Sequence, residues 1–238
     1  MPRVSPVASH ESLRVFIGYD QREACALHTC VQSIIETCSR PVQITPLALN
    51  MIRSVYVERH VDGSNAFVYS RFLVPWLCGF YGQALYLDGD MIVRGDLVEL
   101  FNERRFDLGV QVVQHDYATT QAEKYLGAKN EDYPRKNWSS VVLWNCSFHP
   151  NRKLTPEFIA SKTGAYLHRF LWLDDERIGA LDPAWNHLCM EYAPNPEAKL
   201  YHYTLGSPCF DGYQEQEGSR EWFDTYRRAI APMPMAGD

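Results

Sequence analysis

The chain has 238 residues, and its shares of 46% hydrophobic and 22% charged residues are those of a globular protein with a packed core. These shares exclude a disordered chain, a collagen-like repeat and a coiled coil. With 23 basic and 29 acidic residues, the net charge of -6 offers no attraction to a phosphate backbone, so no nucleic-acid partner is expected.

The first part of the chain alternates between strand and helix patterns. After a polar lead over residues 1–12, the apolar run 13–18 predicts a strand, and apolar residues at helical spacing predict a helix over about 20–38. A second strand is expected over 41–49, with Pro46 at a sheet edge or a bulge. A strand, a helix and a strand in succession predict a parallel sheet covered by helices.

The alternation continues to the C-terminus without a clear linker. Residues 69–82 predict a helix that ends at Gly82, and 83–93 predict a strand with an acidic turn inside it. The remaining expected elements are a polar loop over 114–137, strands over 108–113, 139–145 and 199–204, and helices over 155–170 and 219–230. The pattern predicts a single α/β domain.

The seven cysteines are odd in number and include no C-x-x-C pair, so neither a disulfide framework nor a zinc ribbon is indicated. We interpret them as reduced thiols. The N-terminal residues contain no apolar stretch suited to a signal sequence, and no segment approaches the ~18–20 apolar residues that span a bilayer. The sequence therefore predicts a cytoplasmic protein.

The most informative motif is Asp88-Gly89-Asp90, which directly follows the apolar run 85–87. In an open α/β sheet, ligands bind beyond the carboxyl ends of the strands. Two carboxylates one residue apart can both face a divalent cation there, and the glycine allows a ligand to approach the backbone closely. The alternative is a hairpin in which Asp-Gly supplies only turn chemistry. The spacing alone leaves both interpretations open.

Several segments, in their order along the chain, resemble glycosyltransferase family 8. They are RVFIGYDQREACALHTCVQSI, YSRFLVPWL, ALYLDGDMIVRGDL, SSVVLWN, LWLDDERIGAL, WNHL and LYHYTLGSPCF, and they span about residues 13–212. The resemblance implies a GT-A fold with a mixed, mostly parallel sheet flanked by helices. It also implies transfer of a hexose-type sugar from a UDP-sugar, dependence on Mn²⁺ with Mg²⁺ as the second option, and retention of anomeric configuration.

The resemblance also divides the expected domain, residues 13–230. Its nucleotide-sugar-binding half covers 13–113 and its acceptor half covers 114–230, with a lead over 1–12 and a tail over 231–238 outside it. The acceptor stays unspecified and could be a glycan, a lipid or a small molecule. For the aromatic and basic C-terminal helix, packing on the domain is favoured over peripheral membrane contact.

The metal ligands and the donor site follow from the resemblance. Asp88 and Asp90 correspond to the family's D-x-D motif, and His202 corresponds to its third metal ligand, although a lone histidine is often a core residue. An oxygen and imidazole set favours Mn²⁺ over Mg²⁺. The residues expected at the donor are Tyr19, Asp20, Arg71, Gly89, Ser139 and Gly206. Helix N-capping is the alternative for Asp20, and a salt bridge is the alternative for Arg71.

The resemblance places the acidic pair Asp174 and Asp175 at the family's Asp-Gln-Asp site, beside the reacting sugar carbon. We hypothesise that Asp175 stabilises an oxocarbenium-like transition state, whereas an acidic helix start is the alternative. Two departures from the family are evident. Trp138 replaces an asparagine of the sugar pocket, and the segment after His202 lacks the lysine that holds the donor phosphates. Backbone amides around Gly206 would have to replace that lysine, or Arg71 would have to carry more of the charge.

Two other functions compete with sugar transfer. A phosphatase of the haloacid dehalogenase type also carries D-x-D at a strand end, but it places that motif on its first core strand. A catalytically inactive sugar-nucleotide binder is compatible with the missing lysine.

Overall fold

The computed structural model describes residues 12–60, 65–119 and 121–231. All but one residue of the expected lead over 1–12, and all but one of the expected tail over 231–238, lie outside the described residues. The strands are β1 (Leu13–Gly18), β2 (Val42–Leu47), β3 (Gln83–Leu87), β4 (Met91–Val93), β5 (Val110–Val112), β6 (Val141–Asn145), β7 (Ile178–Ala180), β8 (His187–Leu188) and β9 (Leu200–His202).

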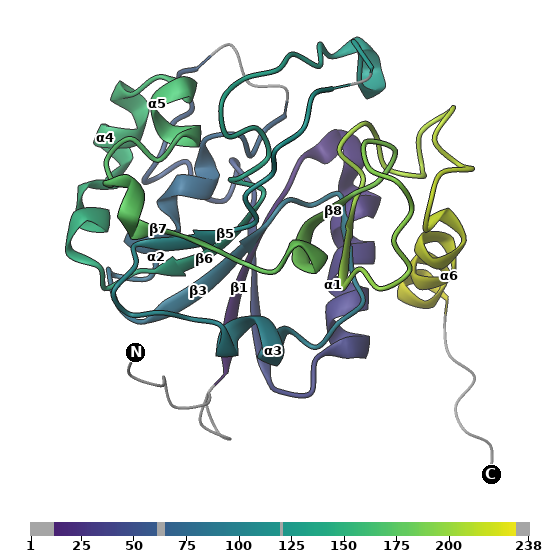
Figure 1. Ribbon diagram of the computed structural model, residues 1–238, viewed down its shortest axis with the longest axis horizontal. Coiled ribbons are helices and arrows are strands. Elements are labelled where there is room, and N and C mark those ends of the chain that lie inside the picture. The colour runs from purple at the N-terminus through teal and green to yellow at the C-terminus, as the bar shows by residue number, and fades with distance from the viewer. Residues whose placement is uncertain (1–11, 61–64, 120, 232–238) are drawn as a thin grey trace.

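The helices flank these strands on both sides (Figure 1). The α-helices are α1 (Ala24–Thr37), α2 (Val74–Leu77), α3 (Leu97–Asn102), α4 (Pro156–Ser161), α5 (Gly164–His168) and α6 (Ser219–Ile230). Short 3-10 helices are η1 (Gln21–Glu23), η2 (Ser70–Leu73), η3 (Tyr125–Gly127), η4 (His149–Lys153), η5 (Asp175–Arg177) and η6 (Pro183–Asn186). None of the helices in the described part of the chain has the length and apolar character needed to cross a bilayer.

A six-stranded sheet in the order β2-β1-β3-β6-β5-β7 forms the centre of the molecule. Strand β1 pairs in parallel with both β2 and β3, and β5 pairs in parallel with β7, whereas β6 runs antiparallel to its two neighbours. A second sheet in the order β4-β9-β8 lies beside it. This mixed, mostly parallel α/β architecture confirms the predicted fold class, and Pro46 lies on the edge strand β2 as expected.

The alternation of side chains along the central strands divides the core into two layers. In β1, Val15 and Ile17 pack against the cluster that contains Ile34 of α1, whereas Phe16 packs in the cluster that contains Phe72 and Leu167 on the other face. Both layers are apolar because parallel strands are covered on both faces. The apolar runs in the sequence therefore predicted the positions of the buried strands well.

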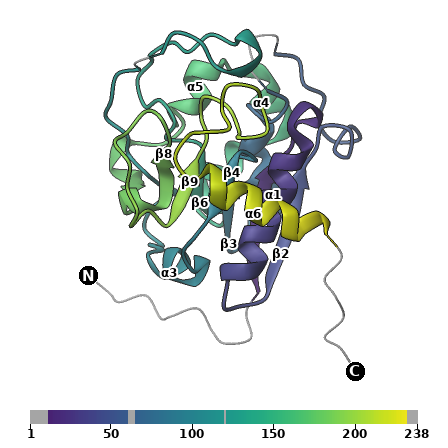
Figure 2. The same ribbon diagram turned by 90° about the vertical axis from the view of Figure 1, so that its right-hand side faces the viewer.

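Helix α6 lies across α1 at the edge of the molecule (Figure 2). Trp222 of α6 is fully buried. Nε of Arg228, also on α6, lies 2.7 Å from Oε1 of Glu36 on α1. The helix therefore packs on its own domain, and its observed bounds coincide with the predicted 219–230.

The expected strand over 83–93 is two strands in two different sheets. Strand β3 belongs to the central sheet and β4 to the small one, with Asp88-Gly89-Asp90 as the connection between them. Because β3 and β4 do not pair with each other, the hairpin interpretation of this turn is wrong.

The expected helices over 69–82 and 155–170 are also shorter than predicted. The first ends at Leu77, and left-handed residues Gly79 and Phe80 follow it. The second is interrupted at Lys162, which is extended, and restarts after Thr163, whose side chain caps α5 by accepting a hydrogen bond from the amide of Tyr166. Apolar spacing predicted the buried faces but missed these interruptions.

The turn after β3 is pressed directly against the end of β1. A Cβ atom added at Gly89 would lie 2.4 Å from the carbonyl oxygen of Gly18, and one added at Gly18 would lie 2.5 Å from Cγ of Phe67. A backbone oxygen cannot move aside as a flexible side chain can. Glycine at position 89 therefore permits a close approach between two backbone segments.

We expect Gly89→Ala to lower the free energy of unfolding by about 3 kcal/mol or more, because the methyl group overlaps a backbone oxygen. The matched control is Gly127→Ala, which adds a methyl group where no atom lies within 4 Å. That control carries only the cost of a left-handed backbone, about 1 kcal/mol. Urea denaturation measures both, and equal losses for the two variants would contradict the close approach.

Candidate active site

Asp88, Asp90 and His202 converge at the point where the two sheets meet. Strand β4 pairs antiparallel with β9, with Met91 opposite His202, and this register brings the imidazole beside the acidic turn. One ligand atom from each of the three residues lies within 4.8 Å of the others, and all three side chains are buried. Nε2 of His202 is 3.4 Å from Oδ1 of Asp90 and 3.9 Å from Oδ2 of Asp88.

The pKa values of the two buried carboxylates shift in opposite directions. Burial raises the pKa of Asp88 above its ordinary value, and the negative charge of Asp90 adds to the effect of burial while Arg71 opposes it. For Asp90, the neighbouring His202 outweighs burial, and the pKa lies below its ordinary value. The two like charges disfavour each other, and a cation held between the carboxylates would relieve this repulsion.

A buried ion pair anchors the turn. Nη1 of Arg71 lies 2.9 Å from Oδ1 of Asp88 and also donates to the carbonyl oxygen of Ser139 at 2.9 Å. The hydroxyl of Tyr86 donates to Oδ1 of Asp88 at 2.7 Å. Arg71 is 5% exposed, so the ion pair that the sequence left as an alternative is present and deeply buried.

A hydrogen-bond network behind His202 orients its ring. Oδ1 of Asn186 lies 3.0 Å from Nδ1 of His202, and Nδ2 of Asn186 donates to Oγ of Ser140 at 2.8 Å and faces Nε2 of His115 at 2.9 Å. Because the amide oxygen can only accept, Nδ1 of His202 carries a proton, and Nε2 is the ring nitrogen that faces the two aspartates. A second residue that sets the tautomer in this way is a common feature of metal-binding histidines.

The side chains of this cluster fit a divalent cation. Among the described residues, Oδ1 of Asp90 is a buried oxygen without a hydrogen-bond donor, and Nε2 of His202 lies 3.4 Å from it. Two carboxylates and an imidazole form a ligand set suited to Mn²⁺ and acceptable to Mg²⁺. The three residues that the sequence analysis named as metal ligands are therefore brought together.

A pocket of about 730 Å³ opens beside the cluster. Its polar and charged lining comes from η2, the turn after β3, the 114–137 loop, the segment before β6, the α5 region and the end of β9. It includes Arg71, Asp88, Asp90, Lys124, Asn130, Lys136, Ser139, His168, Arg169 and His202. Such a volume accommodates a ligand of nucleotide-sugar size.

Two lysines of the 114–137 loop give part of this pocket a positive potential. Lys136 is 5% exposed, and its pKa is lowered by burial and by the charge of Lys124. The charge of Lys124 in turn contributes to the lowered pKa of Asp90. Two ammonium groups that face one space, next to a cation site, favour a bound anion.

The residues expected at the nucleotide lie apart from this lining. Asp20 is buried and accepts hydrogen bonds from the amides of Arg22 and Ala66, at 2.9 and 3.0 Å, and it forms an ion pair with the Arg22 side chain. These contacts lower its pKa against the opposing effect of burial. The N-cap interpretation of Asp20 is thus confirmed, and Tyr19, half-buried beside it, packs partly against the core.

Ser139 and Gly206 differ in what they offer to a ligand. Ser139 lines the pocket, and its Oγ lies 2.7 Å from Nδ1 of His168. Burial, with a contribution from Arg71, lowers the pKa of His168 to about 3, so this imidazole is neutral. The amide of Gly206 donates to the carbonyl oxygen of Tyr203 at 2.9 Å, so it has no hydrogen left for a phosphate.

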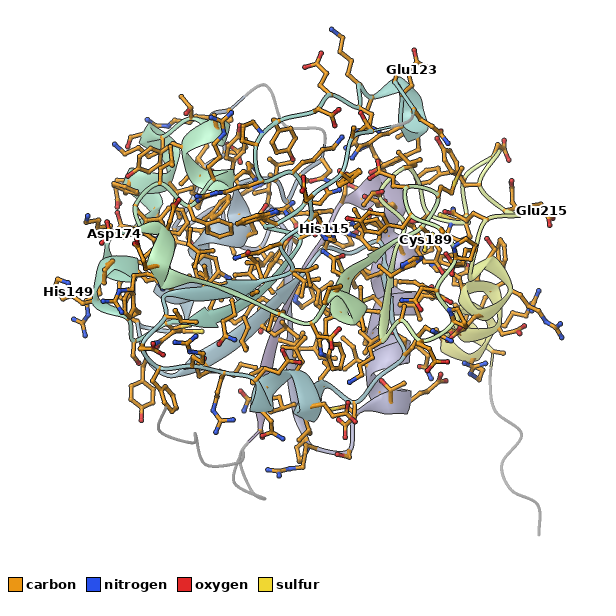
Figure 3. All side chains as sticks on the ribbon, in the orientation of Figure 1. His115, Glu123, His149, Asp174, Cys189 and Glu215 are labelled. Atoms are coloured by element: carbon orange, nitrogen blue, oxygen red, sulfur yellow. The ribbon has the colours of Figure 1, made fainter. Side chains whose placement is uncertain are left out.

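Asp174 and Asp175 are not brought to the pocket. Both are exposed, and Oδ1 of Asp175 accepts a hydrogen bond from Nη2 of Arg135 at 2.6 Å. They precede β7, whereas Asp88 follows β3, and the two strands run in the same direction, so the two pairs of acids lie toward opposite edges of the sheet. Figure 3 shows Asp174 on the left side of the molecule and His115, a member of the hydrogen-bond network of Asn186, near its centre. The catalytic role of Asp175 stays a prediction from the resemblance.

Sequence reasoning missed Asn186, Lys124 and Glu23. Glu23 is buried, accepts a hydrogen bond from the hydroxyl of Tyr125 at 2.8 Å, and leaves Oε2 without a donor among the described residues. Burial and the charge of Asp90 raise its pKa to about 9. The sequence did show an acidic residue, Glu23, soon after the first strand. Acidic residues are common at helix N-termini, so this position did not indicate a functional group.

The fold and the site define a class of protein before any sequence relative is considered. The structure is similar to the bifunctional glycosyltransferase WbbM, with a TM-score of 0.63, 17% identity, and coverage of 97% of this chain and 51% of that one. It is similar to the glycosyltransferase GlyE of Streptococcus pneumoniae TIGR4, with a TM-score of 0.61, 15% identity, and coverage of 93% and 62%. A complex of the galactosyltransferase LgtC with donor and acceptor sugar analogues gives a TM-score of 0.57 at 12% identity, over 93% of this chain and 98% of that one. The protein therefore has the GT-A glycosyltransferase fold, and it spans about half of WbbM.

A sequence relative then assigns the family. Protein CDI of Arabidopsis thaliana is 40% identical over 219 residues, which cover 89% of this chain and 85% of the relative. The chain belongs to the family of Protein CDI. No family model matches the sequence.

We expect Asn186→Ala to weaken Mn²⁺ binding about 10- to 100-fold, because His202 loses the acceptor that fixes its tautomer. Asn186→Asp keeps an oxygen for Nδ1 of His202 and is expected to bind Mn²⁺ more tightly than the alanine variant. Titration of the chelator-stripped protein, followed by the electron paramagnetic resonance of free Mn²⁺, measures the affinities. Wild-type affinity in Asn186→Ala would exclude this role for Asn186.

Glu23 makes the stability of the metal-free protein depend on pH. Its pKa is about 9 in the native state against an ordinary value of 4.5, so the native state holds one more proton than the unfolded state between these values. The contribution of this proton is fully present below pH 4.5 and is lost as the pH rises toward about 9, at up to about 1.4 kcal/mol per pH unit. Glu23→Gln, measured by urea denaturation in chelator at several pH values, should remove this slope. Parallel pH profiles for the variant and the wild type would contradict the assignment.

Proposed function

We propose that the protein is a metal-dependent glycosyltransferase that uses a nucleotide-sugar donor, a UDP-sugar of the hexose type by its resemblance to family 8. The observation that carries the proposal is the cluster of Asp88, Asp90 and His202 at a cationic pocket within a GT-A fold. Retention of configuration and the UDP moiety rest on the resemblance.

Asp88, Asp90 and His202 would hold the divalent ion, for which Mn²⁺ is the preferred candidate. When bound, such an ion neutralises the negative charge that develops on a diphosphate leaving group. Arg71 would affect the donor through Asp88 and not by direct contact, because its guanidinium already binds Asp88 and the carbonyl oxygen of Ser139. Its contribution is to hold Asp88 and the adjoining segment in place.

Lys124 and Lys136 are proposed to bind the donor phosphates. The segment after His202 lacks a lysine, and the amide of Gly206 is engaged, so the phosphate charge needs another partner. Both lysines line the pocket, and Nζ of Lys136 is held by Oδ1 of Asn130 at 2.6 Å. An anion between them would relieve the repulsion between their ammonium groups.

Calorimetric titration of UDP with and without Mn²⁺ tests both assignments. The wild type is expected to bind UDP tightly only with Mn²⁺, and Asp90→Asn should lose that dependence. Lys124→Met should weaken UDP binding about tenfold or more, the effect of one charged hydrogen bond, and should leave Mn²⁺ affinity nearly unchanged. Lys153→Met, at an exposed lysine outside the pocket lining, is the matched control. UDP binding that ignores both Mn²⁺ and Asp90 would overturn the proposal.

Turnover separates an enzyme from a binder. The exposed position of Asp174 and Asp175 is the observation that favours a sugar-nucleotide-binding protein as the second candidate. Metal-dependent release of UDP from UDP-hexoses supports the transferase, whereas metal-dependent binding without release supports the binder. Hydrolysis of simple phosphomonoesters would instead indicate a phosphatase.

A further inference from the structure

His187, Cys189 and Glu217 form a second cluster of metal-ligating side chains, independent of the proposed sugar transfer. One ligand atom from each lies within 4.8 Å of the other two. His187 and Cys189 are buried, and the side chain of Glu217 is 14% exposed. We propose that this cluster is a zinc site that links the small sheet to the segment before α6.

The cluster lies on the opposite face of the small sheet from the first metal site. Strand β8 pairs in parallel with β9, with His187 opposite Tyr201 and Leu188 opposite His202. The rings of His187 and Tyr201 are 5.6 Å apart, so they share one face, and Cys189 shares it because side chains alternate along a strand. His202, one residue on from Tyr201, points to the other face and to the aspartates. Figure 3 shows Cys189 on the side of the molecule that carries α6.

The ligand types differ from those of the first site in a way that selects another metal. A thiolate, an imidazole and a carboxylate are typical of Zn²⁺, whereas two carboxylates and an imidazole suit Mn²⁺. Nε2 of His187 and Oε2 of Glu217 are 2.7 Å apart in a hydrogen bond. Tetrahedral coordination separates two such atoms by about 3.3 Å, so a small opening of this pair admits the ion.

The surroundings hold Glu217 in position. The amide of Asn195 donates to Oε1 of Glu217 at 2.8 Å, which leaves Oε2 directed at His187. Gly218 is pressed against the same face, since a Cβ atom there would lie 2.7 Å from the ring of Tyr201 and 2.8 Å from the hydroxyl of Tyr203. The carboxylate is therefore fixed by an outer hydrogen bond and by its neighbouring backbone, as is usual for metal ligands.

An ion at this site would stabilise one wall of the pocket. The segment between β9 and α6 carries Phe210, whose ring stacks on Tyr125 with centroids 4.5 Å apart. Tyr125 lines the pocket and donates to Glu23. Zinc would hold the far end of this segment to β8 through Glu217. With three protein ligands, the zinc ion would keep a fourth position for water.

Cobalt(II) reports the proposed thiolate ligand directly, because it replaces zinc and absorbs in the near ultraviolet when a thiolate binds it. The full chain, stripped with chelator and reduced, is titrated with Co²⁺. We expect a saturable thiolate-to-cobalt band that excess Zn²⁺ abolishes, and in Asp90→Asn, where the first site cannot compete, saturation at one equivalent. We also expect Zn²⁺ to raise the melting temperature of the wild type.

Cys189→Ser should lose both the band and the thermal shift, and Glu217→Gln should weaken Co²⁺ binding at least tenfold while leaving the thiol intact. Cys209→Ser, at an exposed cysteine, and Asp90→Asn, at the first site, should keep the band. Circular dichroism verifies that each variant folds, and Glu217→Gln tests the site if Cys189→Ser does not. No band in the wild type, or an undiminished band in folded Cys189→Ser or Glu217→Gln, would overturn the proposal.

Discussion

The burial of two carboxylates one residue apart is the constraint on which the rest of this structure depends. Asp88 and Asp90 lie where β3 leaves the central sheet, and neither is exposed enough for water to screen its charge. A buried charge without a partner is strongly unfavourable. The buried guanidinium of Arg71 lies against Asp88, and Nε2 of His202 lies 3.4 Å from Oδ1 of Asp90. A divalent cation at this turn would compensate the charge of both buried carboxylates.

The hydrogen-bond network around His202 orients a third potential ligand toward the two aspartates. The amide of Asn186 cannot donate through its oxygen, so it sets one tautomer of His202, and its nitrogen is bound in turn by Ser140 and faces His115. Burial, with contributions from His202 and His187, lowers the pKa of His115 to about 3, so the His115 ring is neutral. These hydrogen bonds preorganise the ligands for an external ion.

Local patterns predicted the buried elements well, because a strand or helix that buries its side chains must show the corresponding apolar period. Strand β1, helix α1 and helix α6 follow the expectations closely. The errors occur where long-range contacts decide. The apolar residues on both sides of the acidic turn predicted one strand over 83–93, yet the two halves belong to different sheets. A single capping residue, Thr163, restarts the helix that apolar spacing alone extended over 155–170.

The sequence by itself determined the α/β class and the position of the acidic turn, since residue type and spacing carry that information, and its resemblance to family 8 named the three metal-ligand candidates. Only the tertiary structure decided which distant groups meet them. Asn186 reaches His202, Lys124 and Lys136 face one pocket, and Cys189 meets Glu217 because of strand register and loop paths that no local pattern encodes. The same register explains why Asp174 and Asp175, so prominent in the sequence, lie at the other edge of the sheet. Side-chain chemistry is local, but the distance between two side chains is a property of the whole fold.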